Sequence, residues 1–554
     1  MNRAVRRGTL LAIALVSGAL LAGCSTTPAK SAAQEAAERD ARVQANLRTA
    51  TQDLEVSTAA SLASAAEILA REEVRSSTAG TALADFGGRL YSSLFADLKN
   101  PFPPQAGSSS QSVPEGSTFF QEIGPALSLL TPGRAPADEA AADLFNRLTN
   151  ADDVNRDSVL PPYLRAILLQ RQRRPPVSVR PNYEECLRRD SSFYPAKMGI
   201  IQTVIDQGTA QSELSALLKY AGELPSPAAS QAATARIYLG AGQPRQAADA
   251  AARALLLSPD SSQLIMLRAR AFEDMGDWYQ AMSILDGRLR ITPDDSQAIA
   301  MKARLLFEKA GNPDAAMKIA TEAQSKFPND PAFPELRGRI LLARGNSVEG
   351  DAALEQALTL DPMRVSTLSV LADSAARAER WQEAAGYLER IPEWQHSAEI
   401  LQLGWEVSIK VGDYDKALAF AQANEKKAGG EPSLLLRVRT LVAAGRSTEA
   451  KDLAAALLRT ATMPSVRASL YLLRALAEGQ AGADEGIILA DLRSALLENP
   501  DDPEALLAMA DELSAVHEYH KALGYLKRAQ ELSPDDAAIR ARVHDISDRE
   551  SAQP

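Results

Sequence analysis

The sequence predicts an all-α protein in which helical hairpins repeat along most of the chain, after a separate helical region. Hydrophobic residues make up 45% of the 554 residues but aromatic residues only 5%, so alanine and leucine, both strong helix formers, carry the apolar mass. Alternating runs of β-branched residues, the pattern of strands, are hard to find. Proline, glycine and alanine recur at a spacing of 34 residues, which fits a unit of two short helices and their turns.

The first 23 residues have the pattern of a processing signal. Arg3, Arg6 and Arg7 precede an apolar stretch, residues 10–21, that is short for a membrane span. The following Leu21-Ala22-Gly23-Cys24 resembles the lipobox of bacterial lipoproteins, which implies cleavage before Cys24 and lipidation of its thiol. The alternative is an ordinary signal peptide, or a short signal anchor, with an incidental cysteine.

The residue after Cys24 bears on where such a lipoprotein would be anchored. Ser25 stands where an aspartate would resemble the inner-membrane retention signal of bacteria with two membranes. The resemblance therefore implies an anchor in the cell envelope, in the outer membrane and facing the periplasm, with surface exposure as the alternative. No later stretch has the roughly 18 consecutive apolar residues of a membrane span, so we expect the rest to be exported and soluble.

Charge and cysteine content restrict the partners further. Removing residues 1–23 takes away three arginines and no acid, so the formal net charge changes from −11 to −14. A protein this acidic is poorly suited to nucleic acid, or to anionic lipid beyond its anchor. With Cys24 lipidated, Cys186 has no partner in the sequence. We expect it to be a buried thiol rather than half of a disulfide.

Residues 24–155 are predicted to form a helical N-terminal region of no assigned family. Amphipathic patterns over 31–100, 119–130 and 137–148 indicate helices. Residues 101–117 are rich in Pro, Gly and Ser and read as a flexible linker, and residues 150–153 read as a break. The region is interpreted either as a stalk between membrane and repeats or as divergent hairpins that cap the array.

Four tracks of residues define the repeat that follows. Its prolines are Pro225, Pro259, Pro293, Pro328 and Pro362, then Pro500 and Pro534. Its glycines are Gly208, Gly242, Gly276, Gly311 and Gly345. Its two alanine tracks are Ala247, Ala281, Ala316, Ala384, Ala417, Ala450 and Ala522, and Ala254, Ala323, Ala357, Ala495 and Ala529. Glycine admits the positive φ that ends the first helix, proline ends the second, and small residues let the two helices approach closely.

This helix-turn-helix period of 34 residues resembles the tetratricopeptide repeat. The best units start near 228, 262, 297, 331 and 503, and weaker ones near 194, 365, 398, 433 and 467, whereas segments 392–400 and 460–485 break the period. The resemblance implies a solenoid over 156–536 that forms a right-handed superhelix with a concave, protein-binding surface. Residues 537–554 are expected to be a capping helix and tail, with Ile539, Val543 and Ile546 facing the last repeat.

Candidate chemistry is sparse. The sequence has four histidines, and the only cluster, His517-Glu518-Tyr519-His520, lacks the i, i+4 spacing of a zinc-protease helix and falls in a predicted turn. No nucleophile elbow, phosphate-binding loop or dinucleotide fingerprint occurs. We therefore expect no enzyme, no metal, no cofactor and no small-molecule substrate.

One feature points to a binding surface. A small residue followed by arginine recurs in the first helix of four successive units, as Ala235-Arg236, Ala269-Arg270, Ala303-Arg304 and Gly338-Arg339. In later units aspartate takes this place, as Ala372-Asp373 and Ala510-Asp511. In the repeat frame the second residue faces the concave groove, so the arginines would suit an acidic peptide or the C-terminal carboxylate of a partner. The alternative is that they pair with acids such as Glu273 and Glu308 and stiffen the array.

These observations favour a membrane-anchored scaffold or adaptor that binds other envelope proteins or peptides and assists envelope assembly. A surface adhesin or host-interaction lipoprotein is the second hypothesis. A third is an envelope enzyme whose chemistry lies within residues 30–155. The function class rests on fold and anchor together, so the pathway is left open.

Overall fold

The computed structural model describes residues 31–102, 114, 116–133 and 135–551, and every regular element in these ranges is a helix. The predicted all-α class is therefore confirmed. The predicted processing signal, including Cys24, lies outside the described residues. Among the helices described, none combines the length and apolar content needed to cross a membrane. The protein divides into two compact units, Met1–Thr203 and Val204–Pro554.

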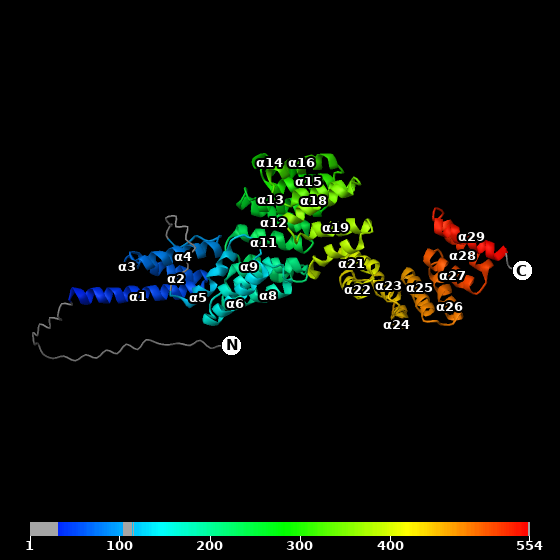
Figure 1. The fold of residues 1–554 in the computed structure, drawn as a ribbon. Helices are drawn as coiled ribbons and strands as arrows, with labels where there is room; N and C mark the ends of the chain where they lie inside the picture. Colours follow the sequence, from blue (N-terminus) through cyan, green and yellow to red (C-terminus); the bar gives the residue numbers. More distant parts are fainter. Residues whose placement is uncertain (1–30, 103–113, 115, 134, 552–554) are drawn as a thin grey trace, which may run out of the picture. The chain divides into compact units, whose positions relative to one another are not determined.

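The first unit contains irregularly spaced helices of unequal length, from 4 residues in α3 to 25 in α1 (Figure 1, blue to cyan). Its elements are α1 (Ala32–Val56), α2 (Ala59–Leu69), α3 (Glu72–Arg75), α4 (Thr78–Leu94), α5 (Thr118–Ile123), η1 (Gly124–Leu130), α6 (Asp138–Val154), α7 (Leu160–Arg171) and α8 (Pro176–Arg189). Helix α9 (Tyr194–Gln207) crosses the division between the units.

Aromatic side chains form much of the core of this first unit. Phe86 meets Phe120 edge-to-face with ring centroids 4.9 Å apart, and Phe95 meets Phe193 in the same way at 5.7 Å. Such contacts add about 0.5–1.5 kcal/mol beyond the burial of the rings. Phe95 and Phe193 lie far apart in the sequence, so the hairpin α7–α8 and the start of α9 pack with the N-terminal helices. The compact division consequently falls later than residue 155.

Two local predictions for this unit concern breaks between its helices. Most of the predicted linker 101–117 lies outside the described residues, but Phe102 at its start is buried, and a Cβ added to Gly87 would come within 2.5 Å of its ring. The predicted break at residues 150–153 is wrong, because α6 continues to Val154. Asp152 at its end accepts hydrogen bonds of 2.7 Å from both Arg165 and Arg189, and this pairing holds the last turn.

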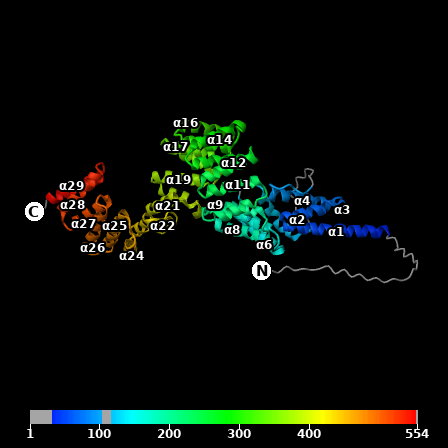
Figure 2. The same ribbon diagram turned by 180° about the vertical axis from the view of Figure 1, so that it is seen from behind.

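The second unit is a succession of antiparallel hairpins, which Figure 1 and Figure 2 show from α11 (green) to α28 (red). After α10 (Leu214–Gly222) the hairpins are α11 (Pro227–Gly240) with α12 (Pro244–Leu257), α13 (Ser262–Asp274) with α14 (Trp278–Ile291), α15 (Ser296–Glu308) with α16 (Pro313–Lys326), α17 (Ala332–Ala343) with α18 (Ser347–Leu360), α19 (Val365–Arg377) with α20 (Trp381–Glu389), α21 (Ala398–Val411) with α22 (Tyr414–Ala428), α23 (Glu431–Ala443) with α24 (Ser447–Leu458), α25 (Pro464–Gln480) with α26 (Glu485–Glu498), and α27 (Pro503–Ala515) with α28 (Tyr519–Leu532). Helix α29 (Ala537–Ser551) ends the unit.

The two predicted irregular segments have structural causes. Residues 392–400 contain the short 3₁₀ helix η2 (Glu393–Gln395), which replaces the usual turn between α20 and α21. Residues 460–485 contain α25, which has 17 residues where its counterparts have 12 to 14. Each change shifts the following hairpin in the sequence without removing it.

The repeat tracks carry out the roles predicted for them. All seven members of the first alanine track, from Ala247 to Ala522, have 0% exposure. The five glycines from Gly208 to Gly345 all have positive φ, between 60° and 82°. Two turns reach the same left-handed conformation without glycine, at Glu379 (φ 57°) and His517 (φ 64°). Both residues fall on the same track, so the turn geometry belongs to the repeat rather than to one residue type.

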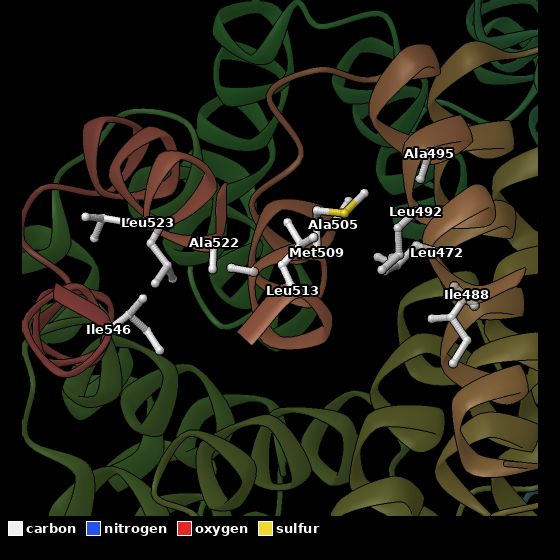
Figure 3. Close-up of a cluster of buried hydrophobic side chains, with 13 residues drawn as sticks. Leu472, Ile488, Leu492, Ala495, Ala505, Met509, Leu513, Ala522, Leu523 and Ile546 are labelled. Carbon is white, nitrogen blue, oxygen red and sulfur yellow. The ribbon is translucent and has the colours of Figure 1, made fainter. Parts of the chain in front are cut away.

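The hydrophobic core runs continuously from one hairpin to the next. Figure 3 shows this for the last hairpins, where Leu472, Ile488 and Leu492 of α25 and α26 are followed by side chains of α27, α28 and α29. At the end of the row, the predicted inward face of α29 is in place, because Ile539 and Ile546 are buried and Val543 packs beside them.

Candidate partner-binding groove

The four predicted arginines line one groove of about 440 Å³ in the second unit. The first helices of four successive hairpins form it, namely α11, α13, α15 and α17. We call it the arginine groove, and its lining residues are Arg236, Gln263, Met266, Leu267, Arg270, Ala300, Met301, Arg304, Ala332, Glu335, Leu336, Arg339 and Arg364.

The repeat itself places the arginines there. Ala235, Ala269 and Ala303 have 0% exposure, and Gly338 is buried as well. A Cβ at Gly338 would come within 2.6 Å of Leu354 and 2.9 Å of the Gly350 carbonyl oxygen, so α17 and α18 approach too closely for a larger residue. Because the small residue points into the hairpin, the arginine after it points into the groove.

The floor of the arginine groove is apolar. Met266 and Leu267 come from α13, Met301 from α15 and Leu336 from α17. Met301 and Leu336 are buried, while the first two are half-buried. Unbranched methionine adapts to irregular ligand surfaces. The groove therefore combines an adaptable apolar base with cationic sides.

Two of the four arginines are paired within the protein. Arg304 donates to both oxygens of Glu273, at 2.6 and 2.7 Å, and its Nη1 also lies 3.0 Å from Glu308 Oε2. Arg339 Nη1 lies 2.7 Å from the other oxygen of Glu308. The network links α13, α15 and α17, so these two arginines make the internal ion pairs that the alternative interpretation named, while both also line the groove.

The network also determines the protonation states of Glu273 and Arg304. Burial alone would raise the pKa of Glu273, but the hydrogen bonds and positive charge of Arg304 outweigh it, and the pKa of that carboxyl is lowered. The hydrogen bonds to Glu273 in turn raise the pKa of Arg304 above its ordinary value. Both groups are therefore charged at neutral pH and hold each other in a fixed geometry.

Arg236 and Arg270 differ from these two. Among the described residues, no carboxylate lies within ion-pair distance of either guanidinium. Arg270 is exposed, and its positive charge acts to lower the pKa of the nearby Glu273 and Asp274 without forming an ion pair with either. Arg236 is half-buried, and loss of hydration lowers its pKa. One end of the groove thus presents cations that the protein itself does not neutralise.

The other end of the groove is closed by a buried carboxylate. Glu335 of α17 has 6% exposure and is paired with Arg364, which precedes α19. Its Oε2 also accepts hydrogen bonds from Ser366 at 3.0 Å and Thr367 at 3.2 Å. No sequence pattern indicated this cluster, because its members come from different repeats and do not share a track.

The two aspartates predicted for the later groove lie in different surroundings. Asp373 forms an ion pair of 2.8 Å with Arg377 one turn along α19, and it does not line the arginine groove. Asp511 lines a second groove, formed by α25, α26 and α27, and lies 3.2 Å from Arg542 of α29. The structure therefore does not join the six predicted residues into one site.

The remaining candidate residues show no catalytic arrangement. His517 lies in the turn between α27 and α28, as the sequence predicted, whereas His520 lies in the first turn of α28, with its Nδ1 2.8 Å from Glu550 Oε1. In the part of the protein that the structure describes, no three His, Cys, Asp or Glu side chains are grouped to hold a metal ion. Cys186 is buried, as predicted, and burial raises the pKa of its thiol.

Fold and groove together define a helical-repeat scaffold of the kind that binds other proteins along a surface made by successive hairpins. The tetratricopeptide repeat family model matches residues 238–305, which run from the end of α11 into α15 and include two of the four arginines, Arg270 and Arg304. The protein therefore contains tetratricopeptide repeats.

Solved structures with a similar arrangement of helices include PilW, a type IV pilus biogenesis factor, at 18% identity and TM-score 0.31 over 37% of this protein and 94% of that one. Another is pilF of Pseudomonas aeruginosa, at 18% identity and TM-score 0.31 over 37% and 93%. A third is the APC/C hetero-tetramer Cut9–Hcn1, at 13% identity and TM-score 0.41 over 92% and 97%. No curated protein matches the sequence.

Proposed function

We propose that this protein is a cell-envelope adaptor, anchored through lipid on Cys24, that holds an acidic and partly apolar segment of a partner protein in the arginine groove. The observation that carries the proposal is the presence of Arg236 and Arg270, without carboxylate partners among the described residues, beside an apolar floor. A cation that loses hydration without gaining an opposite charge is unfavourable. A carboxylate of a bound peptide would supply that charge through hydrogen bonds.

The charge balance of the groove supports an acidic ligand. Its lining has five arginines, whereas the acids on or behind it are Glu335, Glu273, Glu308 and Asp274, the last in the field of Arg270 and Arg304. An excess of one positive charge remains, in a protein whose total charge is −11. A local field that opposes the total charge favours one orientation of a bound segment and disfavours neutral competitors.

The anchor explains how modest contacts could suffice. A lipid on Cys24 would keep the groove at a membrane, where partners in the same envelope meet it at raised effective concentration. The lipobox resemblance of residues 21–24 supports this part of the proposal. Replacement of Cys24 by alanine should move the protein from the membrane fraction to the soluble fraction, and an unchanged distribution would contradict the anchor.

The groove can be tested with two defined probes on the full-length protein in detergent. One is a fluorescent peptide of leucine and glutamate, and the other has lysine in place of each glutamate. The combined change Arg236→Gln and Arg270→Glu should weaken binding of the glutamate peptide about tenfold, since it removes two charge-assisted contacts. Fluorescence anisotropy measures this directly.

A matched control separates groove from total charge. Arg245 on α12 is exposed and lies outside the groove, so Arg245→Glu changes the total charge by the same amount as Arg270→Glu alone. Equal weakening by Arg245→Glu, or no weakening by the groove variant, would overturn the proposal.

In cells, a photocrosslinking residue at exposed Gln263 should capture an acidic segment of an envelope protein. Protection from protease on intact cells distinguishes an inward-facing adaptor from a surface adhesin.

A further inference from the structure

A second groove, of about 510 Å³, lies near the C-terminal end of the same unit. Helices α25, α26 and α27 form it, and none of its lining residues is shared with the arginine groove. We call it the acidic groove, and its lining residues are Leu472, Ala475, Leu476, Gly479, Gln480, Ile488, Leu492, Glu504, Leu507, Ala508, Asp511 and Glu512.

The floor of the acidic groove is apolar and only partly covered. Leu472, Ile488 and Leu492 are buried in the core that Figure 3 shows. Leu507 is half-buried, and Leu476 is 41% exposed. Gly479 helps to keep the groove open, since a Cβ there would meet Ile488 at 3.7 Å and the Glu512 carboxylate at 3.9 Å. The groove therefore offers leucine-sized apolar surface to a ligand.

The rim of this groove carries only negative charge. Its charged lining residues are Glu504, Asp511 and Glu512, and none of its lining residues is Lys or Arg. Glu504 and Asp511 have ion pairs outside the groove, with Arg439 at 3.3 Å and Arg542 at 3.2 Å. Both pairs are between largely exposed side chains, and such pairs contribute little.

Glu512 is the carboxylate without such relief. Among the described residues, no cation lies within ion-pair distance of it. Burial, together with the negative charges of Glu485 and Asp511, raises its pKa above the usual value. The repulsion that Glu512 experiences would be relieved by a cation placed in the groove.

We propose that the acidic groove binds a basic amphipathic segment of a partner protein, with leucine-like side chains on Leu476 and Leu507 and Lys or Arg side chains toward Glu504, Asp511 and Glu512. Charge complementarity selects this occupant, since an acidic or uncharged segment would leave Glu512 without an ion-pair partner among the described residues. The site does not depend on the arginine groove, and a partner that carries both an acidic and a basic segment could engage both.

The same two probes used on the full-length protein test this site. The leucine–lysine peptide should bind, and Glu512→Lys should weaken it about tenfold because it places a like charge against the ligand. Leu476→Ser should also weaken it, through loss of apolar contact without a change of charge, and its effect should persist at high salt, where exposed charges are screened. Arg270→Glu should leave this binding unchanged, so failure of the two proposals can be told apart.

Glu322 on α16 provides the matched control. It is exposed and outside both grooves, so Glu322→Lys changes the total charge as Glu512→Lys does. Similar weakening by both would show attraction to an acidic protein rather than a site, and would overturn the proposal. So would an unchanged affinity of the lysine peptide for Glu512→Lys, or a loss of binding in Glu512→Lys that sedimentation traces to disruption of contacts between two copies of this protein.

Discussion

The arginine groove and the acidic groove occupy the same place in the repeat but carry opposite charge. In each, a fully or nearly fully buried small residue, Ala303 or Ala510, precedes the charged residue that lines the groove, Arg304 or Asp511. Both grooves have the same backbone geometry at this position, and this geometry determines the direction of the Arg304 or Asp511 side chain. The identity of one residue in each unit then decides which ligand the groove suits, which means that the fold specifies a binding surface but not a partner.

The two grooves also differ in how their charges are held. In the arginine groove, the Glu273–Arg304–Glu308–Arg339 network ties three hairpins together. In the acidic groove, two of the rim carboxylates contact only exposed arginines at its edge. We therefore expect the arginine groove to be the more rigid of the two and the acidic groove to adapt more to its ligand.

The largest effect is expected where the hairpins come closest. Gly338→Ala should lower the free energy of unfolding by about 1–3 kcal/mol, because the new methyl group would overlap Leu354 and the Gly350 carbonyl. Ala510→Gly in the acidic groove removes a methyl instead and should cost about 1 kcal/mol. Urea denaturation measures both, and equal costs would show that the two hairpins are packed alike.

Removal of the network is the next test of the contrast. Arg304→Met leaves Glu273, only 11% exposed, without its partner and should cost about 1–2 kcal/mol, less than a fully buried pair because Arg304 itself is 34% exposed. Arg542→Met beside Asp511 should cost a few tenths of a kcal/mol at about half exposure. Hydrogen exchange should show faster opening of α13 and α15 only in the first variant.

The turns give a third comparison. Gly276 in the turn after α13 and His517 in the turn after α27 both have positive φ, at 80° and 64°. Because residues other than glycine pay about 1 kcal/mol for this conformation, Gly276→Ala should destabilise and His517→Gly should stabilise by about that amount. Thermal melting of the two variants should shift in opposite directions. A destabilised His517→Gly would indicate that the contact between His517 Nδ1 and the Tyr519 hydroxyl, 2.8 Å apart, outweighs the strain.

The smallest and most specific expected effect is a change in how the stability of the folded protein depends on pH. The folded-state pKa of Glu273 is lowered by Arg304, Arg270 and Lys309, so the stability that it adds is present above its unfolded pKa and is lost as pH falls through the folded value. The raised pKa of Glu512 has the opposite effect on stability. Ionisation of this carboxyl lowers the free energy of unfolding at neutral pH, and this cost disappears on acidification. Glu273→Gln should therefore destabilise more at neutral pH than near the ordinary glutamate pKa of 4.5, and Glu512→Gln should stabilise more at neutral pH. Parallel pH profiles for the two variants would contradict this assignment.

The repeat frame could be predicted from sequence because it depends on local requirements. The unit starts expected near 228, 262, 297, 331 and 503 lie within one residue of the observed starts of α11, α13, α15, α17 and α27. Glycine and proline constrain only their own turn, so their spacing is readable without knowledge of the rest of the fold. The turn at His517 was predicted, but the left-handed conformation of Glu379 and His517 was not, because their propensities oppose a geometry that the neighbouring helices impose.

The grooves were predictable only in part. The ladder from Arg236 to Arg339 followed from the repeat, and the pairing with Glu273 and Glu308 had been considered, but the sequence could not show that Arg270 lacks such a partner among the described residues. Glu512 was missed, although Glu504, Ala508 and Glu512 recur every four residues along α27 and thus share one face. The N-terminal unit resisted assignment because contacts such as Phe95 with Phe193 join residues that no local pattern relates.

Helices of the second unit pack mainly on the next helix and the one after it. Three hairpins, α19–α20, α21–α22 and α23–α24, lie between those that form the two grooves. Gain or loss of α21–α22 or α23–α24 would change the separation of the two grooves while leaving the lining of each intact. If both grooves bind segments of one partner as proposed, the number of intervening hairpins sets the distance between the two segments that can be bound at once.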